Sequence, residues 1–419
     1  MSMSTKRICT QVHVESGADA RESGANGKSI TFAELPPDIQ QLVVDAMSIP
    51  EAVLWSGTSK VDRQLVVGRI KRVLALTGHP WNFAYTRLLP NDISFHVEVE
   101  HKPWIDDNAM IIFADAIASG ALVQIHTLDL GWNNIGDEGL KAFADACASG
   151  ALENLQELDL CQNKITDVGF ATIFPLLEKG GKLAGLTSFG IGSGITVGGV
   201  KAFAGVLASG ALAQVTTLGL NHNTIGDEGL SALADACANG ALPQLTSLYL
   251  VDNNIGSVGI AALAACANRA FVHVNTMHLS YNAIGDVGLI ALVDACANGA
   301  FAHLIHIEIE DSSIGDIGLT ALANACANEA LVNLTLLDIM GNRFGDDGLS
   351  ALATACENGA LANLTFLNIH DNPIGDDGLS ALAAACDNAK LPSLKILIVE
   401  DIDHEALSAV CLKRNISLE

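Results

Sequence analysis

Apolar and polar positions recur with a fixed period along most of the chain. Aligned segments begin, at steps of about 30 residues, at Leu122, Leu152, Leu183, Leu212, Leu242, Phe271, Phe301, Leu331, Leu361 and Leu391. One copy, residues 242–270, reads LPQLTSLYLVDNNIGSVGIAALAACANRA. The copies share L-x-x-L-x-x-L-x-L-x-x-N-x-I, then a G-D-x-G-L pattern, then an Ala-rich stretch. Such a period predicts a stack of similar strand–helix units.

The first half of each repeat predicts a strand and the second half predicts a helix. Leu248 and Leu250 alternate with other residues, which places both on one face of a strand. The helical half has apolar residues at i, i+3, i+4 and i+7, as in Leu230, Leu233, Ala234 and Cys237. We expect Asp227 to cap the start of its own helix and Asn239-Gly240 to end it.

A polar residue follows the strand in most repeats. It is an asparagine at Asn133, Asn163, Asn223, Asn253, Asn282, Asn342 and Asn372. We expect its amide to bond backbone groups of the adjacent turns. Strands stack ~4.8 Å apart, whereas helices pack ~8–10 Å apart. That mismatch predicts an arc with the strands on the inside and the helices on the outside.

This pattern resembles the ribonuclease-inhibitor class of leucine-rich repeats. The resemblance covers about residues 105–419 and implies an α/β solenoid of curved parallel strand–helix repeats. The repeat from Leu183 departs from it by being one residue short and lacking the asparagine, and Ser312 replaces the asparagine in another. We assign residues 122–419 to the solenoid. Residues 79–121 are expected to be a linker and a degenerate first repeat, or cap, in which Ile105 and Phe113 keep the pattern.

Residues 30–78 predict a small helical head. Leu35-Pro36-Pro37-Asp38 is a helix-start signal, because proline is tolerated in the first turn. The segment resembles an F-box at Leu35, Pro36, Ile39, Leu42, Val43, Val53 and Leu54. That resemblance implies that these residues bind the adaptor of a cullin-type ubiquitin ligase. The alternative is a head that only caps the solenoid. Residues 1–29 are polar and are expected to be a disordered tail.

The acidic excess is confined to the repeats. The 419-residue chain has a formal net charge of −25, and residues 1–104 carry 11 Lys+Arg against 11 Asp+Glu. Residues 105–419 carry 11 against 36. Such a surface disfavours nucleic acid and anionic membrane and favours a basic partner, unless it serves solubility alone. No apolar run reaches the ~18 residues of a membrane span. We expect a cytoplasmic protein, or one delivered into a host cytosol if it comes from an intracellular bacterium.

Catalytic motifs are missing from the sequence. It contains no G-x-x-x-x-G-K-[ST], G-x-S-x-G, H-E-x-x-H or C-x-x-C. We therefore expect no enzymatic activity, no cofactor and no metal site. Seven cysteines hold the same helix position, at Cys147, Cys237, Cys266, Cys296, Cys326, Cys356 and Cys386. Helices ~8–10 Å apart are too distant for disulfides between such positions, so we expect buried free thiols in a reducing compartment.

Variable positions between and after the Leu-x-Leu pair define the candidate binding face. Trp132, Tyr249 and Tyr281 supply aromatic anchors there. His278 lies in the same rows, and an acidic stripe comprises Glu308, Glu310, Asp311, Asp338, Asp371, Glu400 and Asp401. We predict that this face binds a protein with a basic surface. The alternative is that these are ordinary solvated strand residues.

Three functional classes remain open at this point. The repeats and the F-box-like head together imply the substrate receptor of a ubiquitin ligase. The repeats alone imply a stand-alone scaffold or an inhibitor of the ribonuclease-inhibitor type. A solenoid that activates the GTPase Ran is also compatible with the repeat type, but no residue can be assigned to that role.

Overall fold

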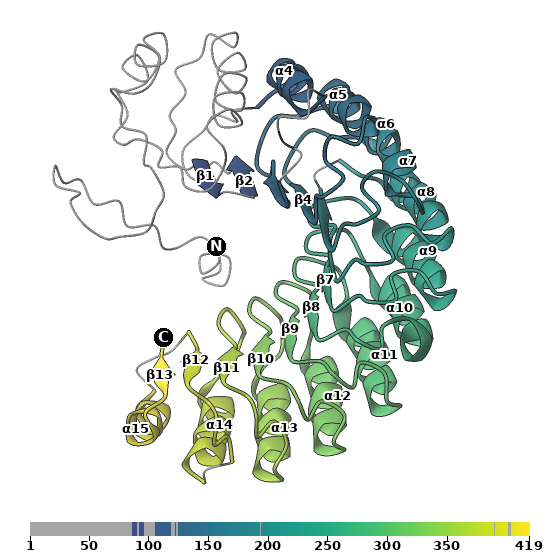
Figure 1. Ribbon diagram of the computed structural model, residues 1–419. Helices are drawn as coiled ribbons and strands as arrows, with labels where there is room; N and C mark the ends of the chain where they lie inside the picture. The colour runs from purple at the N-terminus through teal and green to yellow at the C-terminus, as the bar shows by residue number, and fades with distance from the viewer. Residues whose placement is uncertain are drawn as a thin grey trace, which may run out of the picture.

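The repeats form one curved solenoid in the computed structural model (Figure 1). It describes residues 86–89, 92–95, 105–118, 122, 125–192, 194–388, 390–400 and 404–419. Strands line the inner side of the arc and helices cover its outer side. The 13 strands pair in chain order, β1 with β2 antiparallel and every later pair parallel. The predicted solenoid of parallel strand–helix repeats is confirmed, whereas the predicted tail and head lie outside the described residues.

The strands are short and evenly spaced along the chain. They are β1 Thr86–Leu89, β2 Asp92–Phe95, β3 Thr127–Asp129, β4 Glu157–Leu160, β5 Ser188–Ile191, β6 Thr217–Gly219, β7 Ser247–Tyr249, β8 Thr276–His278, β9 His306–Glu308, β10 Leu336–Asp338, β11 Phe366–Asn368, β12 Ile396–Ile398 and β13 Ser417–Leu418. The helices are α4 Asp107–Ala118, α5 Asp137–Ala148, α6 Asp167–Thr172, α7 Phe174–Leu177, α8 Val197–Ala208, α9 Gly226–Ala238, α10 Ser257–Ala270, α11 Gly285–Ala297, α12 Asp316–Ala327, α13 Asp346–Glu357, α14 Asp376–Asp387 and α15 Glu405–Arg414.

A continuous apolar core lies between the sheet and the helices. Leu248 and Leu250 are fully buried, and the helical stripe that includes Leu230 and Cys237 packs against them. The cysteines among the described residues are free, as expected. Burial raises the pKa of the Cys237 thiol to about 12, so it behaves as a small apolar side chain.

The asparagines link neighbouring repeats through buried hydrogen bonds, as predicted. Asn163 Oδ1 accepts from the Ile135 amide at 3.0 Å, and its Nδ2 donates to the carbonyl oxygens of Leu130 and Leu160. Asn253 differs, because its Oδ1 is buried without a partner. In the repeat before it, Gly226 has φ +60° and donates to the backbone carbonyl of Asn253.

Asp227, at the start of α9, does not cap its own helix, which corrects the prediction. Helix α9 already begins at Gly226, so Asp227 lies inside the first turn. Its Oδ1 instead accepts from the amides of Gly256 and Gly259 in the next repeat, at 2.7 and 2.9 Å. The first amides of a helix have no partner within that helix and carry its positive dipole end. A carboxylate from the neighbouring helix satisfies them.

The same ladder of aspartates explains the glycine in G-D-x-G. Asp286 Oδ1 accepts from the amides of Gly315 and Gly318, and Asp346 repeats this with Gly375 and Gly378. A Cβ on Gly318 would lie only 2.6 Å from Asp286 Oδ1. The glycine therefore permits the close approach of successive helix starts.

Both ends of the described solenoid contain elements that the repeat pattern did not predict. At the first end, β2 pairs in parallel with β3, and the Ile105 amide bonds to Asn133 Oδ1 as in a full repeat. At the last end, α15 is followed by β13, which extends the sheet beyond β12. No helix within the described residues is long and apolar enough to cross a bilayer.

Candidate functional site

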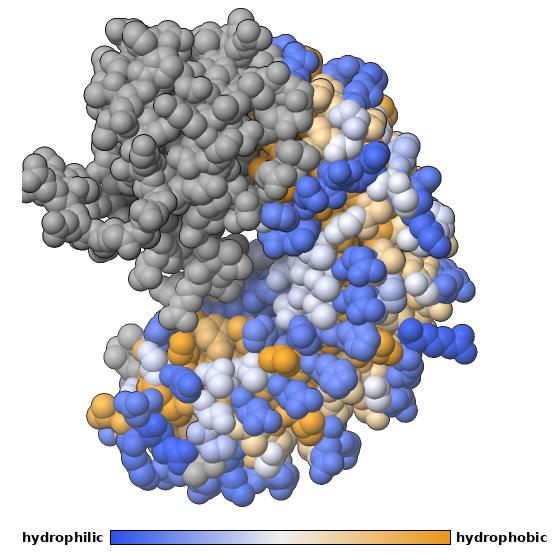
Figure 2. All heavy atoms as spheres, viewed as in Figure 1, coloured by the Kyte–Doolittle hydropathy of each residue, from blue (hydrophilic) through white to orange (hydrophobic). Residues whose placement is uncertain are grey.

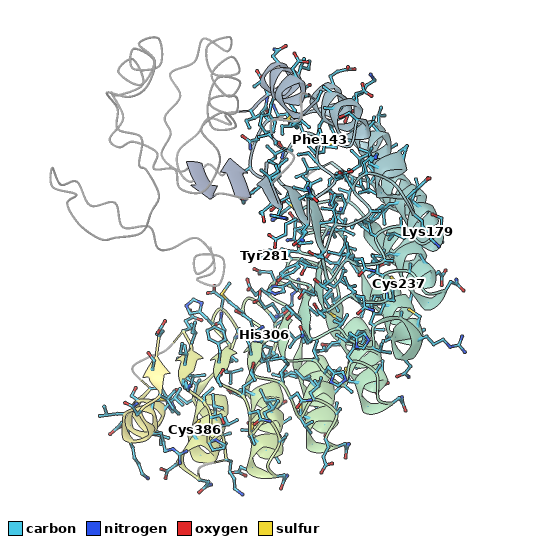
Figure 3. The ribbon with its side chains drawn as sticks, viewed as in Figure 1. Phe143, Lys179, Cys237, Tyr281, His306 and Cys386 are labelled. Carbon is cyan, nitrogen blue, oxygen red and sulfur yellow. The ribbon has the colours of Figure 1, made fainter. Side chains whose placement is uncertain are left out.

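Parallel pairing places one variable residue of each repeat beside the next across the inner face (Figure 3). The middle row runs, in paired order, Asp129, Asp159, Gly190, Gly219, Tyr249, His278, Glu308, Asp338, Asn368 and Ile398. Each residue of this row stands between the two apolar residues of its Leu-x-Leu pair, one of the variable positions that define the candidate binding face. The sheet thus brings Tyr249, His278, Glu308 and Asp338 together as neighbours.

The aromatic candidates do not form one patch. Tyr249 stacks on His278, with ring centroids 4.5 Å apart and planes inclined by 25°. Tyr281 follows the adjacent strand β8 and is 47% exposed. Trp132 is also exposed but follows β3, five strands away along the sheet. At ~4.8 Å per strand, roughly 24 Å separates Trp132 from Tyr281.

Residues at the turn after each strand are held rigidly by the backbone. Trp132, Tyr281, Asp311 and Asp371 all have positive φ, between 46° and 58°. Their conformation is costly for a residue with a Cβ and persists where the surroundings impose it. The Tyr281 amide donates to the Glu310 carbonyl at 2.8 Å, which continues the parallel ladder beyond the strand. These side chains are consequently presented in fixed positions at the rim of the inner face.

The acidic stripe divides into a buried part and an exposed part. Glu308, Glu310 and Asp338 are 7%, 4% and 5% exposed, and we call these three residues the acidic cluster. By contrast, Asp311, Asp371 and Glu400 are exposed at the rim. Asp401, the last member of the predicted stripe, lies outside the described residues.

Each carboxyl of the acidic cluster has polar contacts to neighbouring strands. Glu308 Oε2 lies 2.6 Å from His278 Nδ1, in an ion pair when the imidazole is protonated. Asp338 accepts from Asn368 Nδ2 at 3.1 Å and from the Met340 amide at 3.2 Å. These contacts join β8 to β9 and β10 to β11 through side chains as well as through the backbone.

Burial changes the protonation of the acidic cluster. It raises the pKa of Glu310 to about 8, with Asp338 and Glu308 adding like-charge repulsion. It also raises the pKa of Asp338 to about 6, partly offset by hydrogen bonds from Asn368 and Met340. At neutral pH the acidic cluster therefore carries less negative charge than its three carboxyls suggest.

The first residue of each strand forms a further row that the sequence analysis missed. From β3 to β8 this row is hydroxyl or acidic, at Thr127, Glu157, Ser188, Thr217, Ser247 and Thr276. It then changes to His306 and to the apolar Leu336, Phe366 and Ile396, which pair with each other in register. The change is visible in the sequence at the position before the Leu-x-Leu pair.

Leu336, Phe366 and Ile396 are only half-buried, and we call them the apolar row. Figure 2 shows hydrophobic side chains among polar ones on the C-terminal repeats. Because strand residues alternate between faces, Leu336 and Asp338 point to the same inner side. The apolar row therefore borders the acidic cluster.

A polar groove of about 790 Å³ runs along the start of the central strands. It is lined by Thr216, Gln244, Thr246, His273, Asn275, His303, Ile305, Asn333, Thr335 and Asn363. His273 and His303 are exposed there. Within the described part of the chain, no three His, Cys, Asp or Glu side chains are grouped so as to hold a metal ion.

Comparison with protein families agrees with this geometry. Seven segments match the leucine-rich-repeat model: residues 125–144, 151–173, 214–234, 242–264, 272–293, 330–353 and 360–383. The chain carries leucine-rich repeats. The repeats from Leu183 and from Phe301, where the post-strand asparagine is lost, are among those that the model does not match.

Other comparisons add little. No curated protein matches the chain. Among solved structures, an internalin, InlF of Listeria monocytogenes, is similar at 18% identity, over 73% of this chain and 88% of that one, with a TM-score of 0.41. At that level the likeness carries no argument about the function of the leucine-rich repeats described above.

Proposed function

We propose that the leucine-rich repeats recognise a protein partner on the inner face of the solenoid. The observation that carries this proposal is the register of the strands. It aligns variable side chains such as Tyr249, His278 and Asp338 on a frame that repeats almost unchanged. An invariant frame with variable inner residues is typical of a scaffold adapted to one binding partner.

Site-specific photo-crosslinking tests this proposal. A crosslinking amino acid at Tyr281, which is exposed at the inner rim, is compared with one at Val287, which is 68% exposed at the start of α11. We expect a partner to be captured from the Tyr281 position and to bind the purified chain. A partner captured only from Val287 would place the binding site on the outer edge.

The partner is proposed to present a basic surface. Asp311, Asp371 and Glu400 are exposed carboxylates along the rim. Exposed rim charges govern the rate of association more than the rate of dissociation, and salt screens them within ~8 Å. Replacing Asp311 and Asp371 by Lys should therefore slow association and flatten its salt dependence. Unchanged association kinetics would leave solubility as the role of these charges.

The F-box-like head supports a more specific version of the proposal. Residues 30–78 would bind the ubiquitin-ligase adaptor through Leu35, Pro36 and the helices that follow, while the repeats hold the substrate. A pull-down with purified adaptor tests it, with Leu35→Ala/Pro36→Ala as the control. If the intact chain fails to bind the adaptor, the head is a cap and the protein is a stand-alone scaffold or inhibitor. The assignment to the ribonuclease-inhibitor class and to the cytosol belongs to the same proposal, and the free thiols support the latter.

A further inference from the structure

Two chemically different surfaces meet on the inner side of strands β9 to β12. The apolar row, Leu336, Phe366 and Ile396, crosses three adjacent strands in register. The acidic cluster, Glu308, Glu310 and Asp338, lies on β9, just after it, and on β10. On β10 the two surfaces are only two residues apart. A ligand that lies across these strands would meet apolar contacts on one side and carboxyls on the other.

The spacing of the apolar row favours a helix over an extended segment. Adjacent strands are ~4.8 Å apart, and residues on one face of an extended peptide are ~6.6 Å apart. An α-helix rises 5.4 Å per turn and repeats a side chain on one face at that interval. Over the two intervals between three strands, the side-chain spacing of a helix departs from the strand spacing by about 1 Å in total. For an extended peptide the total departure is about 4 Å.

The charges beside the apolar row determine the polarity of such a helix. Burial, and then like-charge repulsion from Asp338 and Glu308, raises the pKa of Glu310, which places the three carboxyls close together. Exposed Asp311 extends the same carboxyl-rich area to the rim. A Lys or Arg side chain would gain charge-assisted hydrogen bonds with the exposed carboxylates of Asp311 and Asp371, whereas an acidic side chain would be repelled by them.

We propose that the apolar row and the exposed rim carboxylates beside it, Asp311 and Asp371, bind a basic amphipathic helix of the partner. This inference rests on the proposed function. Apolar residues one turn apart would pack on Leu336, Phe366 and Ile396, and Lys or Arg on the adjoining face would reach Asp311 and Asp371. Recognition then follows the helix-in-groove mode, in which apolar anchors repeat at i, i+3 or i+4, and i+7.

Binding of a synthetic helix to the full chain tests this inference. The probe is a labelled peptide of about 18 residues, five turns, with Leu on one face and Lys on the adjoining face in an Ala background. We expect fluorescence anisotropy to show saturable binding that Phe366→Ala weakens by about tenfold or more. Ile317→Ala is the matched control, because Ile317 is an apolar residue 68% exposed on the outer side at α12. Leu336→Ala is a second variant, to be used if Phe366→Ala alters the thermal melt.

Two further peptides separate the alternative occupants. A peptide with Glu in place of Lys should not bind, and one interrupted by central prolines should bind at least tenfold more weakly because it cannot stay helical. Equal or tighter binding of the proline peptide would overturn the helix in favour of an extended segment. An equal loss of peptide affinity in Phe366→Ala and Ile317→Ala, or no peptide binding at all, would also overturn the proposal of a helical partner. Sedimentation that shows dimers lost in Phe366→Ala would assign the surface to a second copy.

Failure of this inference can be distinguished from failure of the proposed function. The crosslinking comparison between Tyr281 and Val287 uses the natural partner and does not depend on its conformation. Capture from Tyr281 without binding of the synthetic helix would leave recognition on the inner face intact and remove the helical partner alone.

Discussion

Strands β3 to β6 and strands β9 to β12 share one backbone arrangement but present different side chains. The first group has Gly190, Gly192 and Gly219 on its inner side, with hydroxyl or acidic residues in its first row. The second group presents the apolar row and the acidic cluster. Because the asparagine and aspartate ladders run through both groups, the difference shows that the frame and the recognition surface vary independently.

The glycines after β5 have a structural cause. A Cβ on Gly192 would lie 2.2 Å from the Asn221 carbonyl oxygen, and one on Gly194 would lie 2.2 Å from the Ile165 carbonyl oxygen. This is the repeat from Leu183, which is one residue short, so its chain passes close to both neighbours. The shortened repeat leaves little room for side chains at these positions. The full-length repeats of β9 to β12 have no such restriction at the corresponding Glu310 and Met340.

Substitution of the helix-start glycines should have the largest effect and should affect both halves equally. Gly318→Ala and Gly139→Ala each place a Cβ 2.6 Å from an aspartate oxygen of the preceding repeat. We expect a loss of about 3 kcal/mol in the free energy of unfolding, measured by denaturant titration. Gly205→Ala in α8 is the control, since a Cβ there meets nothing within 4 Å. It should stabilise by about 0.5–1 kcal/mol. If Gly318→Ala also stabilised the protein, the close contact between this glycine and Asp286 would be contradicted.

Truncation of the exposed aromatics should weaken partner binding in the C-terminal half of the solenoid but not in the N-terminal half. Tyr281→Ala is expected to weaken binding of the captured partner by about 2 kcal/mol, mainly through faster dissociation. Exposed aromatic residues at an interface are typical hot spots. Trp132→Ala, equally exposed but five strands away, should change the affinity little. Surface-binding kinetics of both variants measure this. The reverse order would move the site to the N-terminal half.

Removal of the bridging asparagines should lower the free energy of unfolding by less than the glycine substitutions do. The loss should depend on how many hydrogen bonds each asparagine makes. Asn163 bonds through both its oxygen and its nitrogen, whereas Asn253 bonds through its nitrogen alone. We expect Asn163→Ala to destabilise by about 2 kcal/mol and Asn253→Ala by about 1 kcal/mol, since buried groups that lose a partner remain desolvated. Thermal and denaturant melts provide the comparison. A larger loss for Asn253→Ala would mean that its oxygen also stabilises the fold.

The pH dependence of stability should belong to the C-terminal half. The folded protein raises the pKa of Glu310 from its ordinary value of 4.5 to about 8. The stabilising contribution is therefore complete below about pH 4.5 and is lost as the pH rises through about 8. Melting temperature should fall over this window, and Glu310→Gln should flatten the decline. Asp371→Asn, which removes an exposed carboxylate, is the control and should leave the decline unchanged.

The repeat pattern determined most of the frame without a structure. Its period placed a strand and a helix in each unit, because alternation and the i, i+3, i+4 spacing depend only on local backbone geometry. It also located the bonded asparagines and the middle row from Asp129 to Ile398, since one residue per repeat must recur on the same face. The candidate residues from Trp132 to Glu400 were all found on the inner face or its rim.

Tertiary packing decided what depends on the neighbouring repeat. Asp227 contacts Gly256 and Gly259 because stacking brings together residues about 30 positions apart, which a local capping rule does not consider. The burial of Glu310 and Asp338, and their raised pKa values, depend on how tightly adjacent strands pack their inner side chains. The distance between Trp132 and Tyr281 follows from the number of strands between them. Sequence periodicity assigns a residue to a face, whereas desolvation and proximity are set only when the faces of successive repeats are packed together.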